Sequence, residues 1–135
     1  MTHILIVDDS ETERGFLQHV LEKNGFKTTC VGTAEDGLVK AQELKPDLIL
    51  MDVLLPGMSG FHATRKLTHD TETEHIPVII VSGKTQQSDQ AWGERQGACE
   101  YLTKPVTDDV LLAAVRRHLP EGASRSATRP HDREQ

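Results

Sequence analysis

The sequence predicts a doubly wound α/β domain, in which five helices cover a parallel sheet of five strands. Short aliphatic runs recur along the chain without alternating polar residues, a pattern typical of strands that are covered on both faces. A helical pattern of apolar residues follows each run, and the connections are short. Strands and helices that alternate in this way form parallel βαβ units. The 135 residues are enough for one domain with one core.

The first predicted strand, 4–7, reads ILIV, and the first helix begins soon after it. Ser10 and Glu13 have the spacing of a capping box, in which a serine side chain caps the helix and a glutamate three residues later bonds back to it. One face of this helix is apolar and carries Phe16, Leu17, Val20 and Leu21. Asn24–Gly25 is a typical helix end.

The later elements repeat this alternation. The remaining strands read TTCV, LILM, VIIV and YLT, at 28–31, 48–51, 78–81 and 101–103. Thr33, Ser59 and Thr107 are the expected caps of the second, third and fifth helices. The fifth helix carries the apolar residues Val110, Leu111, Ala114 and Val115, and it ends at His118 before Pro120.

Residues 1–119 are expected to form the domain, and residues 120–135 a disordered polar tail. The tail contains only Ala123 and Ala127 as apolar residues, and its three acidic residues balance three arginines. A segment of this composition cannot bury enough apolar surface to order itself.

Composition excludes several classes of function. A formal net charge of -6 and a pI near 5.6 argue against a nucleic-acid partner. No apolar run approaches the roughly 20 residues of a membrane span, and the N-terminus lacks the pattern of a signal peptide, so we expect a cytoplasmic protein without membrane insertion. Cys30 and Cys99 are expected to be reduced structural thiols. The seven scattered histidines are expected to be surface residues with no role in metal binding.

Polar side chains end four of the five predicted strands. They are Asp8 and Asp9 after the first strand, Asp52 after the third, Ser82 after the fourth, and Lys104–Pro105 after the fifth. In doubly wound sheets, ligands bind outside the carboxyl ends of the strands, where the winding direction reverses. The sequence therefore predicts that three carboxylates, a hydroxyl and an ammonium meet at one edge of the sheet.

Three adjacent carboxylates repel one another unless a cation neutralises them. Mg²⁺ fits this set because it prefers oxygen ligands and keeps several of its waters. Asp52 could then act as a nucleophile on phosphorus and form an acyl phosphate, while Lys104 and the Ser82 hydroxyl each contact a phosphoryl oxygen. A cis Lys104–Pro105 peptide would aim the lysine back at the site.

Four stretches of the chain resemble the receiver domain of two-component response regulators. They are LIVDDS, LILMDVLLPGMSG, VIIVSG and YLTKPV, and the resemblance covers residues 3–119. It implies a flavodoxin-like sheet with the strand order 2-1-3-4-5. It also implies a signalling protein rather than an enzyme, one that promotes only its own phosphorylation and dephosphorylation.

The resemblance implies a role for each site residue. Asp52 accepts a phosphoryl group from a sensor histidine kinase or its phosphotransfer domain. Asp9, Asp52 and the main-chain carbonyl of Leu54 hold Mg²⁺, and Asp8 assists through water.

The resemblance further implies that Ser82 and Tyr101 form a switch. In the family, the hydroxyl moves toward the phosphoryl group and the aromatic ring turns inward. This movement reshapes the face of the fourth helix, fifth strand and fifth helix, where a target protein could bind. We expect a monomer.

The chain is also similar to the small stand-alone receivers of type IV pilus twitching motility, through GFHATRKL, IPVIIVSGK and WGERQGACEYLTKPV. Two functions stay open on the same chemistry: output through the switched surface, or a phosphate sink that drains a shared kinase without a target of its own. Trp92, on the fourth helix, is either a partner anchor or half-buried packing.

Rival families fit less well. A hydrolase of the haloacid dehalogenase type would carry a second acid at the position of Leu54. A P-loop would need a glycine at the position of Val78. Some receivers have a polar side chain where Leu54 lies, and it orients the hydrolytic water, so Leu54 predicts slow self-dephosphorylation.

Overall fold

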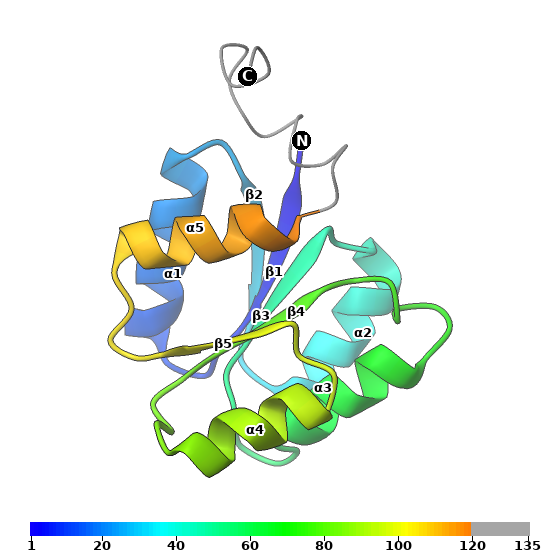
Figure 1. Cartoon of the computed structure of the whole chain (residues 1–135). Helices are drawn as coiled ribbons and strands as arrows, with labels where there is room; N and C mark the ends of the chain where they lie inside the picture. Colours follow the sequence, from blue (N-terminus) through cyan, green and yellow to red (C-terminus); the bar gives the residue numbers. More distant parts are fainter. Residues whose placement is uncertain (120–135) are drawn as a thin grey trace.

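The chain folds into one parallel sheet with helices on both faces (Figure 1). The computed structural model describes residues 1–119, and the expected tail at 120–135 lies outside the described residues. The strands are β1 (His3–Val7), β2 (Lys27–Val31), β3 (Leu48–Met51), β4 (Val78–Ser82) and β5 (Glu100–Thr103). The helices are α1 (Glu11–Lys23), α2 (Ala34–Leu44), α3 (Gly60–His69), α4 (Gln87–Arg95) and α5 (Asp108–His118). The strand order is β2-β1-β3-β4-β5 with every pair parallel, which confirms the predicted fold.

Two apolar layers hold the helices against the sheet. Side chains of a strand alternate between its faces, so Ile4 and Ile6 belong to one layer while Leu5 and Val7 belong to the other. The first layer lies under α1 and α5, and the second lies under α2 and α3 (Figure 1). Unbroken apolar runs such as 48–51 are thus buried on both faces, as the sequence predicts.

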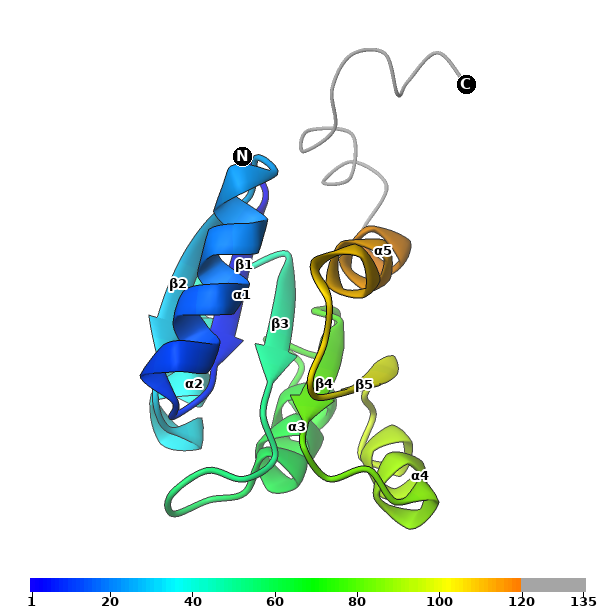
Figure 2. The same cartoon turned by 90° about the vertical axis from the view of Figure 1, so that its left-hand side faces the viewer.

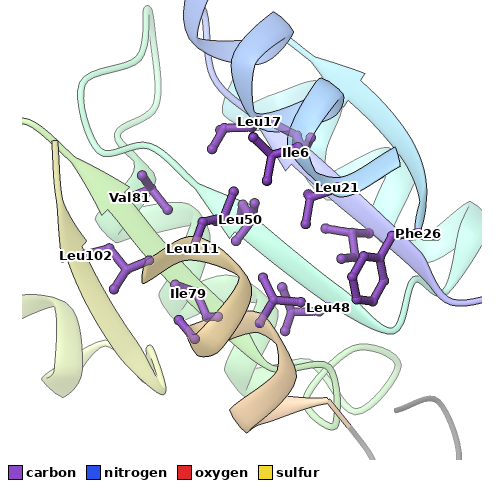
Figure 3. Close-up of a cluster of buried hydrophobic side chains, with 14 of the residues drawn as sticks. Ile6, Leu17, Leu21, Phe26, Leu48, Leu50, Ile79, Val81, Leu102 and Leu111 are labelled. Carbon is purple, nitrogen blue, oxygen red and sulfur yellow. The ribbon is translucent and has the colours of Figure 1, made fainter. Parts of the chain in front are cut away.

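The layer under α1 and α5 is the larger of these two clusters (Figure 3). Leu17 and Leu21 of α1 point toward Ile6 of β1, and Leu111 of α5 faces the β3 and β4 side chains. Leu111 is fully buried. Burying a leucine of this size contributes about 2 kcal/mol of transfer free energy, so this layer fixes α1 and α5 firmly on the sheet.

All four predicted helix caps form. The hydroxyls of Ser10, Thr33, Ser59 and Thr107 each accept a hydrogen bond from a backbone N–H three residues later. The capping box at α1 differs from the prediction, because the N–H of Ser10 donates to the Asp8 carboxylate at 3.0 Å and Glu13 faces elsewhere. The first helix is therefore tied directly to a predicted site residue.

Not all of the apolar helix residues are buried, and one expectation for the histidines was wrong. Phe16 and Val110 are 39% and 49% exposed, whereas Leu17 and Leu111 beside them are buried. His3 and His118 are half-buried rather than on the surface, and they bond to Thr29 and Glu100 respectively.

The predictions of a cis peptide and of free thiols agree with the structure. The Lys104–Pro105 peptide is cis, and both cysteines are free. Within residues 1–119, no helix combines the length and hydropathy needed to cross a membrane.

Candidate active site

The candidate site lies at the carboxyl edge of the sheet, where the strand arrows of β1, β3 and β4 end together (Figure 2). Backbone hydrogen bonds continue the sheet one residue beyond these strands. The Asp52 N–H donates to the Val7 carbonyl at 2.9 Å, and the Lys104 N–H donates to the Ser82 carbonyl at 2.9 Å. The main chains of Asp52 and Lys104 are thereby held in register with the neighbouring strands before any side chain is considered.

The three aspartates meet as predicted. Carboxylate oxygens of Asp8, Asp9 and Asp52 lie within 4.8 Å of one another. Asp8 and Asp52 are only 1% and 6% exposed, whereas Asp9 is exposed. Each of the three contributes hard oxygen ligands, and no sulfur or imidazole belongs to this cluster. The donor set fits Mg²⁺, which prefers carboxylate and water oxygens and needs few protein ligands.

Lys104 joins two of these carboxylates. Its Nζ lies 2.9 Å from Asp8 Oδ2 and 3.2 Å from Asp52 Oδ2. Burial alone would lower the pKa of Lys104, but its hydrogen bond to Asp8 and the charges of Asp52 and Asp8 outweigh burial, so the pKa is raised. Lys104 therefore stays protonated between the two buried carboxylates.

The positive charge near Asp52 does not balance the negative charge of the surrounding carboxylates. Burial raises the pKa of Asp52, and the negative charge of Asp8 adds to this shift, while Lys104 opposes it. One ammonium does not neutralise three neighbouring carboxylates, so the site has an excess of negative charge that a divalent cation would offset.

The loop after Asp52 is built around a close backbone approach. Val53 N–H donates to Asp52 Oδ1 at 2.7 Å, and Gly60 N–H donates to the Val53 carbonyl at 3.0 Å. A Cβ at Gly60 would lie 1.8 Å from the Asp52 carbonyl oxygen, so only glycine fits there. Leu54 lies in this loop with its side chain 60% exposed.

The two predicted switch residues are connected through Lys84. Ser82 is fully buried, and its Oγ accepts the Lys84 N–H at 3.2 Å. The Tyr101 hydroxyl donates to the Lys84 carbonyl at 2.8 Å. Burial raises the pKa of Tyr101, and a side-chain hydrogen bond with Ser82 opposes this shift. One backbone segment thus contacts both side chains.

Three residues near the site were not predicted. Glu13 Oε1 lies 3.8 Å from the Lys104 ammonium, Lys84 links the switch residues, and Arg14 donates to the Asp8 carbonyl. Their positions in the sequence, shortly after a strand end, could have indicated them. The first turns of a following helix lie beside the same edge of the sheet.

The cysteines do not compete as nucleophiles. Desolvation raises the pKa of Cys30, and it raises that of Cys99 to about 11. A thiol with a raised pKa carries little thiolate at neutral pH, so the carboxylate cluster is the stronger candidate for nucleophilic chemistry.

Comparisons with known proteins agree with this geometry. The chain matches the family described as the response regulator receiver domain over residues 4–116. It is 51% identical to Protein PilH of Pseudomonas aeruginosa over 115 residues, which are 85% of this chain and 95% of that protein.

Two solved structures are also similar. Chemotaxis protein CheY4 of Vibrio cholerae has a TM-score of 0.83 and 28% identity, and the match covers 88% of this chain and 99% of that chain. The receiver domain of a sensor histidine kinase from Pseudomonas aeruginosa, solved with a magnesium ion in its active-site cleft, has a TM-score of 0.80 and 27% identity. That match covers 86% of this chain and 95% of that chain.

Proposed function

The chain belongs to the response regulator receiver domain family, and from this premise we propose that it accepts a phosphoryl group on Asp52 in a Mg²⁺-dependent reaction. The donor is a sensor histidine kinase or its phosphotransfer domain. The observation that carries the proposal is a nearly buried carboxylate, Asp52, held 3.2 Å from the Lys104 ammonium and within 4.8 Å of two further carboxylates.

In the proposed reaction, a carboxylate oxygen of Asp52 attacks phosphorus while the bond from phosphorus to the donor breaks. An acyl phosphate forms, and the released donor atom takes the leaving electron pair. Lys104 pairs with one phosphoryl oxygen, and the Ser82 hydroxyl donates to another. Both groups lie at the ends of the neighbouring strands β4 and β5, at the same edge of the sheet as Asp52.

Asp9, Asp52 and the Leu54 main-chain carbonyl would hold Mg²⁺ directly, and Asp8 would assist through water. The ion, when bound, neutralises charge that develops on the phosphoryl oxygens. The solved receiver with magnesium in its cleft supports this assignment by analogy. Asp8 also keeps Lys104 in place through an ion pair, in which Lys104 Nζ lies 2.9 Å from Asp8 Oδ2.

The phosphoryl group would act as a signal through Ser82. A new dianion favours the arrangement in which the Ser82 hydroxyl turns to it, and the Lys84 segment and Tyr101 respond because they are hydrogen-bonded to one another. The face of α4, β5 and α5 would then present a different surface to a target protein. The protein acts as a monomeric cytoplasmic signalling protein on this view.

The similarity to Protein PilH supports a role among stand-alone receivers of type IV pilus control. Of the two outputs, Leu54 favours a switched target surface over a phosphate sink. A sink must lose its phosphoryl group quickly, and an exposed leucine beside Asp52 offers the attacking water no hydrogen bond.

The mass of the intact protein tests the proposal. The protein is incubated with Mg²⁺ and acetyl phosphate, beside an Asp52→Asn variant and a sample containing a chelator. We expect the mass of one added phosphoryl group in the first sample and no gain in the other two. Labelling of Asp52→Asn to the same extent would assign the acceptor elsewhere, and no gain under conditions that label another receiver would contradict the mechanism.

A further inference from the structure

Arg14 reaches from α1 to the acidic pair that ends β1. Its Nη1 donates to the main-chain carbonyl of Asp8 at 2.8 Å. This carbonyl belongs to the peptide that joins Asp8 to Asp9, the two carboxylates that follow β1. The guanidinium therefore contacts the backbone that carries both carboxylates, and within residues 1–119 no ion pair joins it to either of them.

A second strand limits where this guanidinium can lie. Gly32 directly follows β2, and a Cβ there would lie 3.3 Å from Arg14 Nη1 and 4.0 Å from the Asp9 Cα. A contact of 3.3 Å is tighter than most Cβ contacts, so a methyl group would make the guanidinium shift by a few tenths of an ångström. Arg14 thus fills the space between the Asp8 carbonyl and the end of β2.

The three carboxylates differ in how they are held. Asp8 bonds to Lys104 and to the Ser10 N–H, and Asp52 bonds to Lys104. Asp9 is exposed, and within residues 1–119 no hydrogen bond or ion pair holds its carboxylate. The direction of the Asp9 side chain therefore depends on its backbone, and Arg14 bonds to the peptide immediately before it.

We propose that Arg14 is a positioning residue that orients the Asp8–Asp9 peptide and thereby sets the affinity of the carboxylate cluster for Mg²⁺. This inference rests on the proposed function, because it needs the cluster to bind the ion. Groups that orient metal ligands without touching the metal commonly change metal affinity by about 10-fold or more when they are removed.

The charge of Arg14 and its positioning of the peptide have opposite effects on Mg²⁺ affinity, which makes the proposal testable. Arg14 is a cation near three anions, so its charge alone repels a second cation and its removal would strengthen Mg²⁺ binding. Its hydrogen bond to the peptide orients Asp9, so its removal would weaken Mg²⁺ binding. The sign of the change in affinity therefore distinguishes the two.

The experiment measures Mg²⁺ binding to the unphosphorylated full chain by isothermal titration calorimetry, after thermal unfolding confirms that each variant is folded. Arg14→Gln removes the charge and the guanidinium fork. Gly32→Ala keeps the charge but displaces the guanidinium. Gly15→Ala is the matched control, because a Cβ at Gly15 meets nothing within 4 Å. We expect Mg²⁺ to bind about 10-fold more weakly to Arg14→Gln, which removes the orienting group, more weakly by a smaller factor to Gly32→Ala, which only shifts it, and unchanged to the control.

Phosphorylation by acetyl phosphate gives a second readout. The Mg²⁺ concentration for half-maximal rate should rise in both test variants, while the rate at saturating Mg²⁺ stays near that of the wild type, because Asp52 and Lys104 are untouched. Unchanged or tighter Mg²⁺ binding in Gly32→Ala and Arg14→Gln would overturn the inference and leave the proposed function intact. A wild-type protein that binds no Mg²⁺ would overturn both. If Arg14→Gln fails to fold, Gly32→Ala alone decides, since it removes no hydrogen-bonding group.

Discussion

Lys104 sets the charge balance of the site, because it faces three carboxylates and pairs closely with two. Asp8 and Asp52 are 2.9 and 3.2 Å from its Nζ, and Glu13 is 3.8 Å away on the solvent side. A phosphoryl group on Asp52 would have to compete with these anions for the same ammonium. Small changes in the competing carboxylates should therefore alter the rate of phosphorylation.

Glu13→Gln is expected to speed phosphorylation by acetyl phosphate. Glu13 is 42% exposed and lies 3.8 Å from the Lys104 ammonium, the group that a phosphoryl oxygen would also contact. Removing one partly screened charge should raise the rate by about 2-fold at low salt, and the gain should disappear at high salt. Rates measured across ionic strengths check this. Glu11→Gln, in the same first turn, is the control. An equal rise in the rate of this variant would show that the effect comes from net charge alone.

Leu54→Asn is expected to shorten the lifetime of the phosphorylated protein. A polar side chain in this exposed position can hydrogen-bond to the attacking water, whereas leucine cannot. One hydrogen bond worth about 1 kcal/mol in the transition state corresponds to about 5-fold faster hydrolysis. Decay of the phosphorylated mass after removal of the donor measures it, with Leu54→Met as the apolar control. Equal decay in Leu54→Asn and wild type would show that Leu54 does not limit hydrolysis.

Among the secondary-structure elements, the sequence was most informative where the signal is local. Ser10, Thr33, Ser59 and Thr107 cap their helices as predicted, because a cap involves only residues three apart. The sequence showed no start for α4, and its N-cap, Gln86, indeed makes no side-chain capping bond. Phe16 and Val110 are exposed although they are apolar, because helix periodicity does not reveal where a covering helix stops overlapping the sheet.

The end of α5 is tied to the start of β5 by Glu100, which leads to a prediction about pH. Glu100 bonds to Arg117 at 2.6 Å and to His118 at 2.6 Å. The hydrogen bond to Arg117 is the main cause that holds the pKa of Glu100 below its ordinary 4.5. Because the folded pKa is lowered, this carboxylate stabilises the fold above pH 4.5, and the contribution is lost as the pH falls through the folded pKa.

Urea unfolding of wild type and Glu100→Gln tests this at pH 7 and at steps below pH 4.5. We expect the variant to be slightly less stable at pH 7, because solvent screens the partly exposed pair, and the difference to shrink at low pH. Glu43→Gln, which removes a pair within one exposed helix, should change stability less. A difference that is constant with pH would show that packing, and not the charge, is responsible.

Gly60 joins α3 to the loop that follows Asp52. Gly60→Ala should destabilise the protein by about 3 kcal/mol or more, because its Cβ would overlap the Asp52 backbone and neither segment can yield easily. Gly15→Ala, in the open interior of α1, should instead stabilise by about 1 kcal/mol. Thermal unfolding measures both. A stable Gly60→Ala would mean that the loop after Asp52 moves freely, against the fixed geometry seen here.

At the scale of the whole molecule, the parallel sheet explains why the site was predictable and its surroundings were not. Parallel strands bring their carboxyl ends to one edge, so Asp8, Asp52 and Lys104 could be placed together from strand ends alone. Arg14 and Lys84 act through contacts between elements, a guanidinium on a strand-end carbonyl and a loop carbonyl on Tyr101. Such contacts depend on how a helix or loop lies over the sheet, which residue spacing does not specify.

The same contacts connect the site to α4 and predict a signal that can be observed. Tyr101 bonds to the Lys84 carbonyl, and its ring lies so near Gly93 that a Cβ there would approach it to 3.0 Å. Trp92 is next to Gly93, is 49% exposed, and is the only tryptophan of the chain. A change in Ser82 and Tyr101 should therefore alter the surroundings of Trp92.

Phosphorylation is expected to change Trp92 fluorescence, and Tyr101→Phe is expected to reduce this change. Phenylalanine keeps the ring but loses the hydroxyl that bonds to Lys84, so the site and α4 should be less tightly coupled. Emission is recorded before and after acetyl phosphate with Mg²⁺, and the phosphorylated fraction is measured by mass so that the two proteins are compared at equal labelling. Asp52→Asn should give no change. A full fluorescence response in Tyr101→Phe would mean that the signal reaches α4 without this hydroxyl, leaving the backbone from Ser82 to Gln86 as the connection.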